Sequence, residues 1–150
     1  MSAIIRFKDL LTPALQRKLD QIADKRPILQ AMGDAAVSIA NLAFMDPAMR
    51  LSPWAPKKDG STATLKSVPD PLLCKSLIAL PPSEDMIEVG SDLLRLGSDR
   101  DYARAQNFGY APRNLPARPF FPITQDGDVL EAAETAIAGA MAAAVEKALR

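Results

Sequence analysis

Histidine is absent from this chain of 150 residues, and cysteine occurs once. Without histidine, the chain lacks the commonest general base and the commonest metal ligand of proteins. A single cysteine excludes an intrachain disulfide. Because no histidine can activate Cys74, we interpret it as a small, half-buried hydrophobe rather than a nucleophile. These absences argue against a catalytic site, and we predict no catalytic, cofactor-binding or metal-binding residues.

Neither sign of charge is in excess, since Lys+Arg and Asp+Glu both number 18. A nucleic-acid-binding domain is usually basic, so we expect no sequence-specific nucleic acid binding. No apolar run approaches the roughly 18 residues that span a bilayer, and the first residues lack a signal-peptide pattern. We therefore expect one soluble domain over residues 1–150, in the cytoplasm or in a virus particle, with no membrane partner.

The first third of the chain has the pattern of a short strand followed by two helices. Residues 4–7 form a short segment that begins with two β-branched isoleucines, which favours a strand. Two apolar stripes then recur at helical spacing, interrupted at residues 24–27, and Pro13 suits the first turn of the first helix. The stripes consist of Leu11, Leu15, Leu19 and Ile22, then Leu29, Met32, Ala36, Ile39 and Ala43. We expect two antiparallel helices, each buried on one side.

Residues 46–71 contain five prolines, a density that prevents both a helix and a central strand. Long loops inside a compact domain are typically functional or disordered. We therefore predict an extended loop or arm over residues 46–74, mobile in the free subunit and ordered on a partner. Trp54, the only tryptophan, is either an interface anchor or a locally packed residue, and both readings stay open.

The second half of the chain predicts a sheet and a terminal helix. Apolar runs at residues 75–80 and 86–90 flank a polar, proline-bearing connection, as in a hairpin, and residues 118–124 are a candidate third strand. Asp128 and Glu131 have capping-box spacing before a helix that holds nine alanines between positions 132 and 148. Its predicted apolar face consists of Leu130, Ala133, Ile137, Met141, Ala144 and Ala148. We expect this face to lie on the sheet or on a neighbouring subunit.

The fold class that these elements predict is α+β. A small antiparallel sheet would pack with two N-terminal helices and one long C-terminal helix. The charged residues 99–101 fit a solvated helix cap better than an acid–base pair. The lysines at 57, 58 and 66 fit a loop kept soluble.

Two short stretches carry the most specific pattern. Residues 102–109 form a polar run that ends in Phe108-Gly109, as in a short helix closed by a glycine. In the second stretch, Pro116 and Pro119 keep the chain extended around Arg118. A guanidinium held in this way suits a carboxylate or main-chain carbonyls, either within the subunit or across a subunit boundary. The following Phe120-Phe121 is predicted to begin a buried segment.

These stretches resemble the signature of the phage virion-morphogenesis family, the tail-completion and head–tail-joining proteins of tailed phages. The family's core reads roughly Tyr-Ala-x-x-His-Gln-Phe-Gly, then Pro-Ala-Arg-Pro-Phe. The matching residues are Tyr102, Ala103, Phe108 and Gly109, then Pro116, Ala117, Arg118, Pro119 and Phe120. Trp54-Ala55-Pro56 is similar to the family's loop signature, and Val89-Gly90-Ser91 to its Val-Gly-Ser element. The order of these pieces along the chain makes the combination specific.

The chain departs from the family pattern in two places. Gln106 and Asn107 stand where the family usually has His-Gln, which removes titration but keeps hydrogen-bonding capacity. We therefore interpret these positions as structural. The segment of residues 92–101 is longer than the link that the family usually has between the strand and the motif. We expect an extra turn or a different interface there.

The resemblance implies a non-enzymatic virion protein that acts through complementary surfaces. It would form a closed ring of about six copies at the neck or at the head-proximal end of the tail. Its partners would be neck, connector or tail proteins, and its locations the host cytoplasm during assembly and then the virion. Tyr102, Phe108, Gly109, Pro116, Arg118, Pro119 and Phe120 would form the structural motif, with Phe108 in a buried setting. Trp54 and Pro56 would form the candidate interface.

Two other classes stay open from the sequence. One is an assembly-time chaperone or regulatory binding protein that is absent from the mature particle. The other is an enzyme such as a tail-borne peptidoglycan hydrolase, which would need a carboxylate pair in a cleft, and no pair stands out from ordinary surface charge. Within the resembled family, neck protein and tail terminator are not distinguished.

Overall fold

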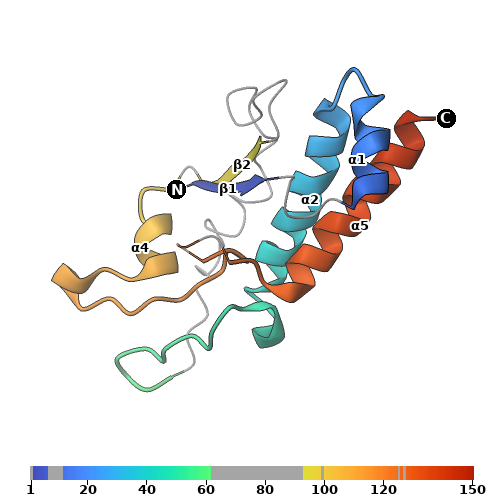
Figure 1. Cartoon of the computed structure of the whole chain (residues 1–150). Coiled ribbons are helices and arrows are strands. Elements are labelled where there is room, and N and C mark those ends of the chain that lie inside the picture. The colour runs from blue at the N-terminus through green and yellow to red at the C-terminus, as the bar shows by residue number, and fades with distance from the viewer. Residues whose placement is uncertain (1, 7–11, 62–92, 99, 125, 127) are drawn as a thin grey trace.

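The computed structural model describes residues 2–6, 12–61, 93–98, 100–124, 126 and 128–150 (Figure 1). The elements, in chain order, are β1 (Ser2–Arg6), α1 (Pro13–Asp20), α2 (Arg26–Leu42), the 3-10 turn η2 (Pro47–Met49), β2 (Leu93–Gly97), α4 (Ala103–Phe108), the 3-10 turn η4 (Ala111–Arg113) and α5 (Glu131–Ala148).

The centre of the fold is the pair of long helices α2 and α5, which lie antiparallel and side by side with α1 against them (Figure 1). The buried residues of α5 are Ala133, Ile137, Met141 and Val145, each four positions from the last, so they line one face. On α2 the buried set is Ile28, Leu29, Met32, Gly33, Ala36, Ile39 and Ala40. Burial of these two faces supplies the main hydrophobic stabilisation of the described part of the chain.

The two predicted N-terminal helices are confirmed. Thr12 is the N-cap of α1, where its Oγ1 accepts a hydrogen bond from the Leu15 amide, and Pro13 occupies the first turn. Pro27 takes the corresponding place in α2. Lys18 of α1 forms an ion pair with Glu146 of α5, and this bond lowers the pKa of the Glu146 carboxyl.

The predicted capping box before α5 is wrong. The N-cap residue is Leu130, which forms no side-chain cap bond. Asp128 lies before the helix, where it is hydrogen-bonded to Thr124. The Thr124 amide donates to the Asp128 carbonyl at 2.8 Å, and the Asp128 amide donates to Thr124 Oγ1 at 2.9 Å. The Leu130 amide donates to the Pro122 carbonyl at 2.8 Å, which fixes the start of the helix. Val145, which the predicted apolar face does not include, is buried, whereas Ala148, which it does include, is exposed.

The α+β prediction is wrong, because the described residues are mainly helical and their core forms around two long helices rather than on a sheet. Their strands form only a two-stranded antiparallel ribbon, in which the leading strand β1 pairs with β2 from Ser2 opposite Gly97 to Arg6 opposite Leu93. β2 occupies part of residues 92–101, the link between strand and motif that is longer than usual for the resembled family. The core is built instead by the two long helices.

The predicted third strand, residues 118–124, is irregular. Pro119 and Pro122 lack the amide donors that a strand ladder requires, and the neighbouring amides bond to a side chain instead. The predicted hairpin at residues 75–90, Cys74 and the Val89-Gly90-Ser91 element lie outside the described residues.

Residues 46–61 of the predicted arm are η2, an extended stretch and a turn closed by the Gly60 amide on the Lys57 carbonyl. The middle of this stretch is held against the core, because Trp54 is only 9% exposed. Residues 62–74 of the arm lie outside the described residues. The expected ordering of the arm on a partner stays a prediction.

We expect Ile137→Ala to lower the free energy of unfolding by about 2–5 kcal/mol, because a fully buried side chain between α5 and α2 is truncated. Leu149→Ala, at a residue that is 40% exposed, should cost less than about 1 kcal/mol. Urea unfolding followed by circular dichroism measures both. Equal midpoints for the two variants would contradict a core formed by α2 and α5.

Candidate functional site

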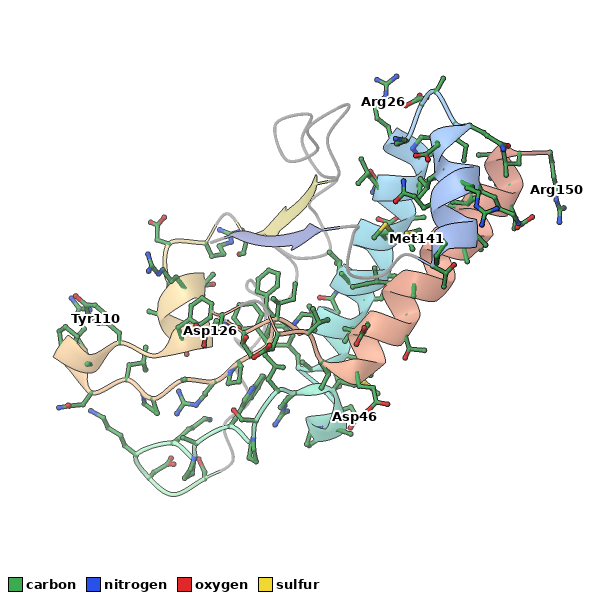
Figure 2. The ribbon with its side chains drawn as sticks, in the orientation of Figure 1. Arg26, Asp46, Tyr110, Asp126, Met141 and Arg150 are labelled. Atoms are coloured by element: carbon green, nitrogen blue, oxygen red, sulfur yellow. The ribbon has the colours of Figure 1, made fainter. Side chains whose placement is uncertain are left out.

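Three short segments meet below the ribbon and beside the helix pair, and one of them is distant from the other two in the sequence. We call this meeting point the three-segment junction; it consists of residues 54–56, 106–109 and 116–121. Its two longest links join residues 65 and 63 positions apart. The junction ties α4 and the chain that follows it to the loop after α2 (Figure 2).

Arg118 links all three segments. Its Nε donates to the Ala55 carbonyl at 3.0 Å and its Nη2 to the Pro56 carbonyl at 3.2 Å. Its main-chain amide donates to the Gln106 carbonyl at 2.7 Å. The residue is 9% exposed, so a buried guanidinium is satisfied by neutral carbonyls through its planar donor fork. The sequence leaves open whether Arg118 binds within its own subunit or across a subunit boundary. The described hydrogen bonds make it a clamp within the subunit.

Trp54 lies at the contact between the arm and the segment after Arg118. Its Nε1 donates to the Pro119 carbonyl at 2.7 Å, and its ring meets Phe44 edge-on with centroids 5.9 Å apart. The guanidinium of Arg50 stacks on the other aromatic surface, with Cζ 3.7 Å from the ring centroid. Trp54 is therefore packed locally. Pro56, in contrast, is exposed and contributes its carbonyl to Arg118.

Arg50 is held in place by more than the indole ring. Its Nε donates to the Ala43 carbonyl at the C-terminal end of α2, at 2.7 Å. Burial lowers the pKa of the guanidinium, and the negative charge of Asp46 acts in the opposite direction. The group remains a cation, because an arginine does not deprotonate in this setting. It thus couples the end of α2 to the arm.

Asn107, a position that we interpret from the sequence as structural, is a central polar residue of the junction. It is 2% exposed, and its Oδ1 accepts hydrogen bonds from two consecutive amides, those of Phe120 at 2.9 Å and Phe121 at 3.0 Å. Its Nδ2 and the Oε1 of Gln106 are buried without a hydrogen-bond partner. The available signal was an asparagine next to the Phe-Gly end of a short helix, a place where such a side chain can bond to main-chain groups.

Gly109 is required by both its conformation and its surroundings. Its φ is +79°, and a Cβ there would lie 2.9 Å from the Leu115 carbonyl oxygen and 3.0 Å from the Ala117 nitrogen. The chain after it forms a tight turn, in which Tyr110 and Leu115 pair through amide–carbonyl bonds of 2.8 and 3.1 Å. Asn114 adopts the left-handed conformation within this turn, which asparagine tolerates.

The predicted motif residues are not all buried. Arg118, Pro119 and Phe120 are buried, whereas Pro116 is exposed, Tyr102 is 42% exposed and Phe108 is 38% exposed. Our expectation that Phe108 has a buried setting is wrong. α4 is only six residues long, and its inward face is formed by Ala103 and Asn107, which places Phe108 on the other side.

The polar side chains of the junction bind main-chain groups, an arrangement that fixes loops and offers no acid–base pair. The described residues contain no group of three or more histidine, cysteine or acidic residues that could hold a metal ion. Among the described helices, none combines the length and apolar composition that a bilayer crossing requires. Comparison with protein-family models, with curated proteins and with solved structures yields no match.

We expect Asn107→Ala to destabilise the chain by about 2–5 kcal/mol, because two buried amides lose their acceptor. The neighbouring amide is the control: Gln106→Ala removes a side-chain oxygen that has no partner and should cost less than about 1 kcal/mol. Chemical denaturation measures both free energies. A loss for Asn107→Ala no greater than for Gln106→Ala would show that the two hydrogen bonds do not hold the junction.

The two phenylalanines of the motif should respond differently to truncation. Phe120→Ala removes a side chain that is 1% exposed and packs 5.3 Å from Phe44, so we expect a loss of about 3–5 kcal/mol. Phe108→Ala, at a half-exposed position, should cost less than about 2 kcal/mol. Thermal unfolding of the two variants provides the comparison, and a reversed order would contradict this assignment of inner and outer faces.

Proposed function

We propose that this chain is a non-enzymatic structural protein of a tailed phage that completes the tail or joins it to the head. In this proposal the subunits form a closed ring at the neck or at the head-proximal end of the tail. The observation that carries the proposal is the convergence of three of the four resembled segments, the ones that lie within the described residues. Trp54-Ala55-Pro56, the Phe-Gly motif and the Pro-Ala-Arg-Pro-Phe motif, selected from the sequence one by one, are bonded to one another.

This convergence supports the proposal because it gives the motif residues a shared physical task. Arg118 binds two carbonyls, Trp54 binds one, and Asn107 binds two amides. Each bond fixes main chain that belongs to an irregular segment. A rigid presentation of loops suits a protein that works by surface complementarity, whereas proton transfer would require a titratable group among these residues.

The substitution of the family's His-Gln by Gln106-Asn107 fits the same reading. Asn107 supplies an amide oxygen as acceptor, and it cannot titrate near neutral pH. A junction that depends on it is insensitive to protonation over the range in which histidine would change charge. In this proposal Asn107 therefore has a structural role, which is to hold the main chain of Phe120 and Phe121.

The test is made on phage particles with the gene for this chain interrupted. We expect unjoined heads and tails, restored by the wild-type gene and by the surface variant Lys58→Ala, but not by Arg118→Ala, which removes the clamp between the arm and the motif. Particle yield and electron microscopy give the readout, and imaging of tagged wild type should locate a ring at the neck. Circular dichroism of purified Arg118→Ala separates a folding defect from an assembly defect.

Normal joining of heads to tails without this protein would overturn the proposal. A requirement for the protein together with its absence from purified particles would favour the assembly-time binding protein instead. A single isolated copy in the particle would contradict the ring.

A further inference from the structure

One end of the molecule is a small lobe with exposed aromatic rings and a positive balance of charge. We define the lobe as residues 100–118, which include α4 and η4 and extend away from the helix pair to Tyr110 (Figure 2). Tyr102, Phe108 and Tyr110 are 42%, 38% and 46% exposed. The lobe contains four arginines and one acidic residue, and two of the arginines, Arg104 and Arg113, are exposed.

A second surface has the opposite charge. We call it the acidic end; it consists of residues 42–46 and 128–134, where α2 ends beside the start of α5 (Figure 2). Asp46, Asp128, Glu131 and Glu134 are exposed there, and residues 119–145 contain no lysine or arginine. Exposed apolar side chains accompany these acids, with Leu42 at 39% and Met45 at 67%.

These two surfaces account for nearly all of the exposed large apolar side chains in the described residues; only Leu149 lies elsewhere. Exposed apolar groups rimmed by charge are typical of protein–protein contacts. The ion pairs of the described helices, Lys18 with Glu146 and Arg26 with Asp24, leave Glu131 and Glu134 available. One chain therefore carries two surfaces that match each other in charge and in apolar content.

We propose that the lobe of one subunit docks on the acidic end of a second copy of this chain. The lobe points away from the acidic end of its own subunit, so the two can meet only between copies (Figure 2). The contact is heterologous, and such contacts close into a ring where the rotation permits. The inference rests on the proposed function and adds the two surfaces that would make the ring.

Charge complementarity selects this partner over a polyanion. A nucleic acid would engage the arginines of the lobe, but it would leave the apolar groups of the acidic end uncovered and would be repelled by the four acids beside them. The chain as a whole has no net charge to attract one. A second copy covers both surfaces at once.

The experiment uses purified full chain in sedimentation velocity over a range of concentrations up to about 1 mM, at low and high salt. We expect wild-type association that weakens at high salt, because exposed charges are screened. Arg104→Glu/Arg113→Glu reverses the net charge of the lobe, and Glu131→Arg/Glu134→Arg reverses two side chains of the acidic end and so removes its net negative charge. Each variant alone should associate at least about tenfold more weakly than wild type.

The diagnostic result is the mixture of the two variants. In an equimolar mixture the two introduced glutamates of one variant meet the two introduced arginines of the other, so association should return to within about threefold of wild type. Arg17→Glu/Arg150→Glu is the matched control, since it makes the same charge change as the lobe variant at exposed positions remote from both surfaces, and it should associate as wild type does. Circular dichroism verifies that each variant is folded. Glu131→Gln/Glu134→Gln, which should weaken association by a smaller factor, replaces Glu131→Arg/Glu134→Arg in the single-variant comparison should that variant not fold.

Wild type that stays monomeric over the whole range, reversed variants that associate like wild type, or a mixture that does not recover would each overturn the inference. Loss of DNA binding by the lobe variant without any change in self-association would overturn it in favour of a polyanion. The particle test separates this outcome from the proposed function: a ring at the neck that tolerates both reversals refutes only these surfaces, and recovery in the mixture without a place in the particle refutes only the phage role.

Discussion

Residues 118–121 are buried without belonging to a sheet, and the rest of the junction follows from the need to satisfy their main chain. A buried amide or carbonyl without a partner costs about 1–3 kcal/mol, so an irregular buried segment needs partners from outside regular structure. Here side chains provide them: Asn107 accepts from two consecutive amides, and Trp54 donates to the carbonyl of Pro119. The arm is in turn held because Arg118 binds its carbonyls.

The short helix α4 connects this buried network with the outer surface. Its inward residues Ala103 and Asn107 belong to the junction side, while Phe108 and the preceding Tyr102 face outward. The orientation of the exposed rings is therefore fixed by the same hydrogen bonds that hold the arm. A motif that reads as one unit in the sequence thus has two physical roles, one structural and one available for contact.

The helices could be predicted from the sequence, because their evidence is local: apolar stripes at helical spacing, Thr12 as a cap, and prolines in first turns. The predicted sheet depends on pairing between distant segments, for which local patterns give no evidence. The candidate strand at residues 118–124 does not form, since Pro119 and Pro122 remove main-chain amide donors that a strand ladder requires. Asp128 failed as a cap because its main chain pairs with Thr124, a contact that spacing does not reveal. For the candidate site, Arg118 was identified from its flanking prolines, whereas Asn107 and the burial of Trp54 depend on contacts more than 12 positions away.

α2 ends at Leu42 and α5 begins at Glu131, so the pairing of these helices joins parts of the chain that are far apart in the sequence. During synthesis, α2 leaves the ribosome long before α5 exists, and its apolar face lacks the cover that α5 provides in that interval. Contacts between distant positions also carry a larger loop-closure entropy and are formed more slowly. The helix pair can therefore close only after translation has reached α5, and until then part of the apolar face of α2 has no partner helix. Shielding of this face by a ribosome-associated chaperone would be needed most during that period, before any subunit is competent to assemble.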